Sequence, residues 1–87
     1  MRIEYETKAI KDLKAIDGGE RAKIIAKIVQ YAANPASLAN NVKRLVNSPF
    51  YRLRVGDYRV IFCLSDGVTI IMTVSRVRHR SEAYDRT

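Results

Sequence analysis

Apolar residues recur at two different spacings along this chain of 87 residues, and each spacing marks a different kind of element. In residues 7–33 they recur every three or four positions, which is typical of helices that bury one side. In residues 2–6, and again from Phe50 onward, they alternate with polar residues, which is typical of strands that bury one face. The pattern therefore predicts one strand, two helices and then three strands.

Two helices are expected within residues 7–33. Thr7 is the expected N-cap of the first helix, and the two glycines after Asp17 end that helix. Asp17 with Glu20 three residues later resembles a capping box that starts the second helix, which stops before Pro35. Residues 36–49 are less regular and are expected to form a short helical turn or a loop. The helices are expected to bury Ala9, Ile10, Leu13 and Ile16, and then Ile24, Ile25, Ile28, Val29 and Ala32.

Two pairs of residues are expected to turn the chain tightly between the last three strands. Gly56 and Asp57 suit a type II′ turn, which needs a positive φ at its first central residue. Asp66 and Gly67 suit a type I′ turn, in which both central residues have a positive φ. Two-residue loops at both places would fix the register of the three strands.

In this register the two faces of the sheet differ sharply. Arg54 lies opposite Arg59, which in turn lies opposite Val74. The face toward the helices is apolar and carries Tyr51, Leu53, Val55, Tyr58, Val60, Phe62 and Ile71. The other face carries Arg52, Arg54 and Arg59 beside Ile61, Cys63, Ile70 and Met72, and an extended last strand adds Arg76, Arg78 and Arg80. Because an exposed apolar patch usually marks a contact surface, we expect a segment of another protein to cover this face.

The order β-α-α-β-β-β predicts an α+β fold, with two helices packed on one face of an antiparallel sheet. At this length the chain is expected to form a single domain, residues 1–87. The one cysteine, Cys63, excludes an internal disulfide and suits a reducing compartment. No signal-peptide pattern and no apolar run of about 20 residues is present, so a cytoplasmic protein without a membrane partner is expected.

The positive charge of the chain is unevenly distributed in kind. The net charge is +7, and residues 50–87 hold seven arginines and no lysine, whereas residues 1–49 hold six lysines and three arginines. The guanidinium group presents a planar fork of donors that suits phosphate. Like charges opposite each other on a sheet are destabilising, so Arg54 facing Arg59 costs stability unless a polyanion binds there.

The arginine cluster suits one kind of chemistry, the cleavage of RNA by its own 2′-hydroxyl. That reaction needs in-line positioning, stabilisation of the charge on the phosphoryl oxygens, and proton transfer. Arginines can stabilise the charge but stay protonated at neutral pH, so the candidates for proton transfer are His79, Tyr84 and Glu82. A single histidine and a single cysteine give no metal-ligand spacing, so neither a metal nor another cofactor is expected.

Each candidate also has a purely structural interpretation. His79 between two arginines is compatible with an ordinary surface residue, and Tyr84 with a cover for the edge of the sheet. Arg76 is expected to pair with Asp57, which the register places opposite it. Glu82 suits an ion pair with an arginine better than the role of a base.

The segments YRLRVGDYRVIF and RVRHRSEAY resemble the RelE/ParE superfamily of bacterial toxins from type II toxin–antitoxin systems. The resemblance covers essentially the whole chain in element order. It implies the β-α-α-β-β-β fold and a cognate antitoxin that wraps and neutralises the toxin. Operator DNA would then be contacted only through the toxin–antitoxin complex.

RelE-like members of the superfamily cut mRNA in the ribosomal A site, with basic residues on the sheet and a C-terminal tyrosine. By motif position, Arg59 corresponds to the arginine of the YR motif, Arg78 to the arginine before the final SExY, and Tyr84 to its tyrosine. Retention of Arg78 and Tyr84 favours this branch, whose partners are the ribosome and its mRNA. The expected catalytic residues are therefore Arg59, Arg78, His79 and Tyr84, and the expected substrate-binding residues are Arg52, Arg54 and Arg80.

Arg52 and Arg54 stand where the best-known RelE branch has two lysines. A lysine with a lowered pKa can take a proton and an arginine cannot, so His79 is expected to carry the proton in this chain. Two alternatives stay open. A ParE-like toxin would inhibit DNA gyrase without nuclease activity, and a basic nucleic-acid-binding module would bind RNA without arresting growth.

Overall fold

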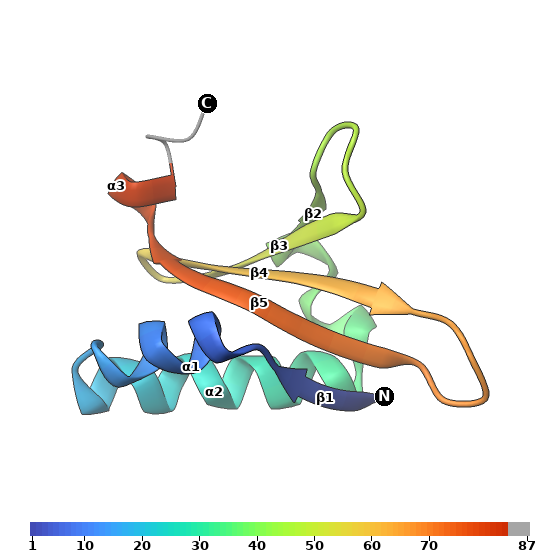
Figure 1. The fold of residues 1–87 in the computed structure, drawn as a ribbon, viewed down its shortest axis with the longest axis horizontal. Coiled ribbons are helices and arrows are strands. Elements are labelled where there is room, and N and C mark those ends of the chain that lie inside the picture. Colours follow the sequence, from blue (N-terminus) through green and yellow to red (C-terminus); the bar gives the residue numbers. More distant parts are fainter. Residues whose placement is uncertain (84–87) are drawn as a thin grey trace.

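The helices and the sheet bury their apolar sides against each other, as the two spacings predict. The computed structural model describes residues 1–83, and Figure 1 shows α1 and α2 side by side along one face of the sheet. The elements are β1 (Arg2–Tyr5), α1 (Thr7–Lys14), α2 (Gly18–Ala33), the 3₁₀ helix η1 (Pro35–Asn41), β2 (Val42–Arg44), β3 (Phe50–Val55), β4 (Tyr58–Ser65), β5 (Ile71–His79) and α3 (Arg80–Ala83). The predicted α+β fold is confirmed. Within residues 1–83, no helix has the length and apolar character needed to cross a bilayer.

The sheet has five strands in the order β1-β5-β4-β3-β2. β1 runs parallel to β5, and the other neighbours are antiparallel. The segment expected to form a short helical turn or a loop contains the 3₁₀ helix η1, and also a strand that was not predicted, β2, which pairs with β3 through Lys43 opposite Arg52. Asn47, in the loop between these strands, has a φ of 55°, a left-handed conformation that asparagine tolerates well.

A side-chain hydrogen bond caps the start of α2, whereas the start of α1 has none. The Asp17 side chain accepts a hydrogen bond from the Gly19 N–H at 3.1 Å, so Asp17 is the predicted N-cap of α2. The prediction that Thr7 caps α1 is wrong by one residue, since Glu6 occupies that position and its side chain makes no cap hydrogen bond. Arg21 of α2 bonds to the end of α1, because its guanidinium donates to the Leu13 carbonyl at 3.3 Å and to the carbonyl of Ile16, just after α1, at 3.1 Å.

The core lies between α1, α2 and the near face of the sheet. Only one narrow stripe of each helix is buried, so Ile10, Ile25 and Val29 are exposed, against expectation. Tyr31 is buried instead, with its ring centroid 5.2 Å from that of Phe62. The buried apolar residues are Ala9, Leu13, Ile24, Ile28, Tyr31, Ala32, Leu38, Leu53, Val60, Phe62, Met72, Val74 and Val77.

The turn between β3 and β4 has the predicted form. Val55 pairs with Tyr58 across the two-residue loop, and Gly56 has a φ of +57°. Asp57 has no positive φ, which distinguishes type II′ from type I′. All the predicted pairs between β3 and β4, including Arg54 opposite Arg59, are confirmed. The predicted pair of Arg59 with Val74 of β5 is wrong, because Arg59 lies opposite Arg78.

The turn between β4 and β5 was predicted wrongly. Ser65 pairs with Ile71, so the loop spans residues 66–70, and neither Asp66 nor Gly67 has a positive φ. The register shifts by an odd number of residues, which exchanges the two faces of β5. Met72 and Val74 are therefore fully buried and Ile71 is not in the core, whereas the predicted register buried Ile71 and left Met72 outside. The observed register is favoured because it buries two large apolar side chains in place of Ile71 and Thr73.

Candidate nucleic-acid interface

A bulge in β5 brings a third arginine beside the two that face each other on β3 and β4. Phe62 pairs with Val74, but Ile61 pairs with Arg76, so Ser75 is one residue in excess. Without this extra residue, the register of the outer part of β5 would place Val77 opposite Arg59. The bulge instead buries Val77 and places Arg78 opposite Arg59.

Arg54, Arg59 and Arg78 thus lie in register across three adjacent strands, and we call them the arginine row. The positions differ in burial: Arg59, at the centre, is only 5% exposed, Arg78 is half-buried and Arg54 is exposed. Side chains on one face of a sheet at opposed positions lie about 5 Å apart at Cβ. The three guanidinium groups are therefore close enough to contact one phosphodiester group and the next one along the RNA.

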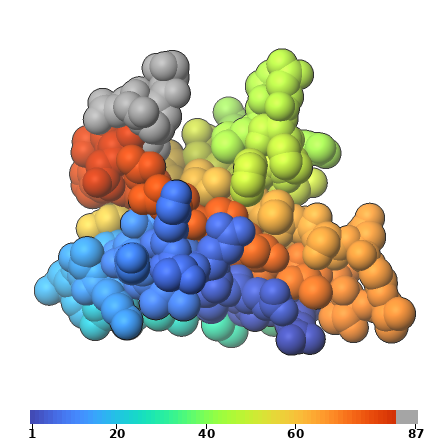
Figure 2. Space-filling view, viewed as in Figure 1, coloured from blue at the N-terminus to red at the C-terminus, as the bar shows by residue number. Residues whose placement is uncertain are grey.

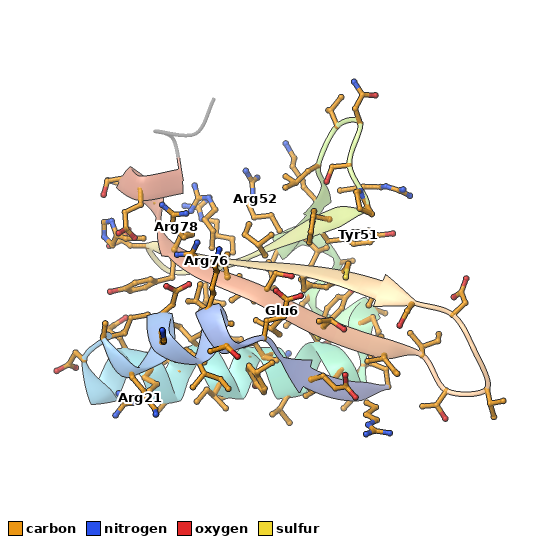
Figure 3. All side chains as sticks on the ribbon, in the orientation of Figure 1. Glu6, Arg21, Tyr51, Arg52, Arg76 and Arg78 are labelled. Atoms are coloured by element: carbon orange, nitrogen blue, oxygen red, sulfur yellow. The ribbon has the colours of Figure 1, made fainter. Side chains whose placement is uncertain are left out.

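Arg52 extends this surface toward β2. It is half-buried, lies opposite Ile61 and Lys43, and its Nε is buried without a hydrogen-bond partner among residues 1–83. In Figure 3, Arg52 and Arg78 are labelled on the face of the sheet away from α1 and α2. In the space-filling view of Figure 2, the surface is hollowed between α3 and the β2–β3 hairpin, above β4 and β5.

This hollow is electrostatically positive over the described part of the chain. The ion pairs found in residues 1–83 are Arg2–Glu4, Lys23–Glu20, Arg76–Asp12 and Arg80–Asp57, so no described carboxylate is paired with Arg52, Arg54 or Arg78. Charge-assisted hydrogen bonds from guanidinium groups to phosphate are strong, and such a site attracts polyanions. Residues 1–83 contain no group of three His, Cys, Asp or Glu side chains placed to hold a metal ion.

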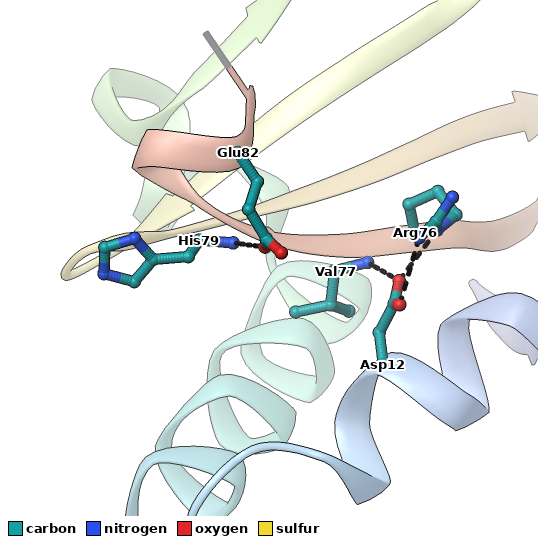
Figure 4. A network of polar contacts seen from close by, with 5 residues as sticks. All are labelled: Asp12, Arg76, Val77, His79 and Glu82. Atoms are coloured by element: carbon teal, nitrogen blue, oxygen red, sulfur yellow. Dashed lines mark hydrogen bonds and ion pairs between the residues drawn. The ribbon is translucent and has the colours of Figure 1, made fainter. Parts of the chain in front are cut away.

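Arg76 pairs with Asp12 of α1, so the predicted pair with Asp57 is wrong. The two Arg76–Asp12 bonds measure 2.8 Å and 3.1 Å, and the same carboxylate accepts from the Val77 N–H at 2.9 Å, as Figure 4 shows. Burial raises the pKa of Asp12, but the hydrogen bonds from Arg76 and Val77 outweigh burial and leave this pKa below its ordinary value. Asp12 therefore holds the end of β5 against α1 beyond the point where β1 ends.

Arg80 is placed at the turn between β3 and β4 and is not in the arginine row. Its backbone N–H donates to the Asp57 carbonyl at 2.7 Å, and its Nε lies 3.8 Å from the Asp57 carboxylate. The side chain is 59% exposed. Arg80 is therefore available to a long polyanion at the rim of the hollow, and Asp57 competes for its charge.

His79 points to the face opposite Arg78, because successive residues of β5 alternate. It pairs with Tyr58, and their rings meet edge to face with centroids 5.3 Å apart. Both line a cavity of about 390 Å³ between α1, β5 and α3, whose other lining residues include Asp12, Ile16, Ser81 and Glu82. Tyr84 lies outside the described residues. The structure therefore brings together Arg52, Arg54, Arg59 and Arg78 among the predicted site residues, and separates His79 and Arg80 from them.

Sequence reasoning missed two features that shape this site. The sequence does indicate the bulge. The apolar residues Met72 and Val74 are two positions apart, but the next one, Val77, follows after three, so one residue is in excess. The sequence indicates the role of Asp12 only weakly: Asp12 is an acidic residue next to the buried Leu13, and the other charged residues of α1 are lysines. Its partner Arg76 is 64 residues away, which no local pattern can reveal.

Comparisons with known proteins agree on a single group of relatives. A family model described as the ParE toxin of the type II toxin–antitoxin system parDE matches residues 3–84. Toxin RelE3 of Methanocaldococcus jannaschii is 33% identical over 88 residues, which cover 98% of this chain and 97% of that protein. A chain in the crystal structure of the RelB–RelE antitoxin–toxin complex from Methanococcus jannaschii is 30% identical, with a TM-score of 0.71 and coverage of 97% of this chain and 98% of that one. A chain of the intact E. coli RelBE toxin–antitoxin complex has a TM-score of 0.72 at 18% identity, with coverage of 90% of this chain and 94% of that one, and at this identity the likeness shows the fold alone.

Proposed function

The chain belongs to the RelE/ParE superfamily of type II toxin–antitoxin toxins, and from this premise we propose that it is an endoribonuclease that cuts mRNA in the ribosomal A site. The observation that carries the proposal is the arginine row, in which the bulge of β5 places Arg78 beside the buried Arg59. Like charges opposite each other on a sheet are destabilising, so the placement of Arg54 and Arg78 beside Arg59 costs stability in the free protein. A bound RNA backbone offsets this cost. Cutting mRNA in the cytoplasm would inhibit translation and so arrest growth of the cell.

In this proposal the sheet stabilises the charge that develops on the scissile phosphate. Arg59 and Arg78 bind the non-bridging oxygens, and their fixed positions mean that little reorganisation is needed during the reaction. Arg52 and Arg54 hold the adjacent backbone so that the 2′-hydroxyl attacks in line. Tyr84, which lies outside the described residues, is proposed to position a base or the attacking hydroxyl.

The place of His79 changes one part of the expectation from the sequence. Its ring lies on the other face of β5 from Arg78, so we do not include it among the groups that contact the phosphate. The 2′-hydroxyl proton then passes to water, and the leaving 5′-oxygen takes a proton from water. Charge stabilisation and in-line positioning supply most of the proposed rate enhancement. The proposed cleavage is independent of metal ions and uses the 2′-hydroxyl of the RNA as the attacking group.

The proposed partners are a cognate antitoxin and the ribosome with its mRNA. The relatives with RelB in their names were solved with that antitoxin, which supports an antitoxin partner for this chain. An acidic or amphipathic segment that covers the arginine row would block the site and neutralise its charge. Operator DNA would be bound only through the toxin–antitoxin complex.

Inhibition of DNA gyrase is a second candidate function, favoured by the match of residues 3–84 to the ParE toxin model. A gyrase inhibitor needs a complementary surface and no reacting groups. Under that alternative, the arginine row would contact DNA or an acidic face of the enzyme, and no RNA would be cut.

Expression of the chain in bacteria without its antitoxin separates the two candidates. We expect growth arrest with cuts in mRNA, mapped by primer extension from total RNA, and with intact chromosomal DNA. Growth arrest with DNA breaks and intact mRNA would favour gyrase inhibition. Normal growth together with salt-sensitive RNA binding in vitro would leave only a basic RNA-binding module.

A further inference from the structure

His79 begins α3 by a reciprocal pair of hydrogen bonds. Its Nδ1 accepts from the Ser81 N–H at 3.3 Å and contacts the Ser81 hydroxyl at 3.0 Å, while its own N–H donates to Glu82 Oε1 at 2.9 Å. With His79 as N-cap, the bond from its N–H to Glu82, the third helical residue, is that of a capping box, and its side chain accepts from Ser81, the second helical residue. Figure 4 shows the Glu82 carboxylate reaching back to the backbone of His79.

We propose that His79 is a pH-sensitive positioning residue whose neutral imidazole caps α3 and so fixes the helix beside the arginine row. An imidazole nitrogen accepts an N–H only through its lone pair, so this cap needs the tautomer with the proton on Nε2. Protonation places a hydrogen on Nδ1. The ring can then still donate to the Ser81 hydroxyl, but the Ser81 N–H loses its acceptor. Histidine is the side chain that makes this change between about pH 5 and 8.

The geometry around the ring decides which contact changes on protonation. Glu82 from α3 and Asp12 from α1 line the same cavity as the ring, and the Ser81 N–H at the start of α3 points to its Nδ1. Arg78 and Arg80 are its neighbours along the chain, and Tyr58 of β4 packs on its face. Asp57 is held by Arg80. Whatever the midpoint, protonation removes only the bond from the Ser81 N–H, so that amide is the specific reporter.

The cap matters to the site because α3 follows Arg78 by only two residues. α3 borders the hollow above β4 and β5 (Figures 1 and 2). Loss of an N-cap acceptor lowers the population of the capped helix about fivefold. The link from this population to cleavage depends on the proposed function; the pH-dependent cap itself does not.

The first test is NMR on the purified chain from pH 8 to pH 5, with the Ser81 amide followed and the Leu53 amide of the core as reference. We expect the Ser81 resonance to move toward its uncapped position as the His79 ring is protonated. Its protection factor, which compares the exchange rate with the intrinsic rate at the same pH, should fall about fivefold. His79→Asn offers an acceptor without a titrating ring and should keep Ser81 protected throughout. His79→Ala should leave it unprotected at every pH. The proposal is overturned if the Ser81 resonance and protection stay constant while the ring is protonated, or if Ser81 is as unprotected in His79→Asn as in His79→Ala.

The second test is cleavage of mRNA held in programmed ribosomes, by the same three proteins over the same pH range. Wild type should lose activity toward low pH, His79→Asn should show a flat profile, and His79→Ala should be low throughout. If His79 were instead the proton carrier, the Asn variant would be as inactive as the Ala variant, although Ser81 is protected. If wild type cuts no RNA at any pH, the proposed function fails while the NMR result still decides the cap.

Discussion

Arg59 is a buried cation with a cation opposite it on each side, an arrangement that folding alone does not favour. Its side chain is 5% exposed, and the register places Arg54 and Arg78 against it from the neighbouring strands. Each such like-charge contact costs roughly 0.2–1 kcal/mol. A site that binds phosphate oxygens gains from the same arrangement, because the donors are already in place when the ligand arrives.

Replacement of Arg78 by alanine should therefore make the free protein slightly more stable. We expect the free energy of unfolding to rise by about 0.2–1 kcal/mol, since one of the two like-charge contacts of Arg59 is removed. Urea unfolding at low salt measures this change. Arg2→Ala is the matched control, because Arg2 is exposed and its ion pair with Glu4 contributes little. A clear loss of stability in Arg78→Ala would show that Arg78 supports the fold.

Asp12→Asn should destabilise the protein at neutral pH, because it weakens the contacts that hold the end of β5 against α1. The Asp12 side chain is 17% exposed and that of Arg76 is 37% exposed, so solvent screens part of the interaction. We expect a loss of about 1–2 kcal/mol in the free energy of unfolding. Asp66→Asn, in the exposed loop between β4 and β5, should change it by less than about 0.5 kcal/mol.

The same contact makes stability depend on pH in the acid range. The folded pKa of Asp12 lies below its ordinary value, so the stabilisation is complete above the unfolded pKa of about 3.9. It is lost as the pH falls through the folded pKa. Thermal unfolding between pH 5 and pH 2 should show a shallower decline for Asp12→Asn than for wild type. Parallel curves would mean that the Asp12 carboxylate is not stabilised in the folded state.

At the level of elements, the sequence predicts best where one residue determines the geometry. Gly56 specifies a two-residue turn, and the whole β3–β4 register follows from it. Asp17 specifies the start of α2 through a local hydrogen bond. These signals act within a few residues, so they can be read without knowledge of the tertiary structure.

Elements fixed by tertiary packing were predicted less well. Asp66 and Gly67 suit a tight turn in isolation, but burial of Met72 and Val74 favours a longer loop with a different register. β2 is a strand only because β3 lies beside it. Arg78 lies on the outer face, as predicted, although the predicted register was wrong. The longer loop exchanges the two faces of β5 and the bulge exchanges them again, so the two changes cancel at Arg78.

The β3–β4 turn provides a direct test of local specification. Gly56 has a φ of +57° and an added Cβ would meet nothing within 4 Å, so Gly56→Ala isolates the conformational cost. We expect a loss of about 1 kcal/mol in the free energy of unfolding. Gly67 has no positive φ and its added Cβ would lie 3.7 Å from the Thr69 carbonyl oxygen, an ordinary contact. Gly67→Ala should therefore be neutral or stabilise by up to about 1 kcal/mol. Equal losses in both variants would contradict the assigned turn.

On the scale of the whole molecule, the sheet separates two surfaces with different tasks. One face and the two long helices form the apolar core, and the other face carries the arginine row. The net charge of +7 adds a long-range attraction for polyanions. A ligand that neutralises the arginine row should therefore stabilise the entire fold.

Phosphate should raise the melting temperature more than chloride does at the same ionic strength. At a concentration several times its dissociation constant, it should add about 1 kcal/mol, which corresponds to roughly 4–8 °C for a domain of this size. Arg78→Ala should lose most of the phosphate-specific increase, while Arg2→Ala should keep it. Equal melting temperatures in phosphate and chloride for wild type would mean that the arginine row does not bind phosphate.

The central claim, that the arginine row cuts mRNA on the ribosome, is tested most directly by primer extension on an mRNA held in programmed ribosomes. Wild type, Arg78→Ala and Arg2→Ala would be compared as purified proteins. We predict cuts in the A-site codon with wild type and Arg2→Ala, and a reduction of about 100-fold or more with Arg78→Ala. Uncut mRNA from a wild-type protein that still arrests growth, or equal cutting by Arg78→Ala, would contradict the claim.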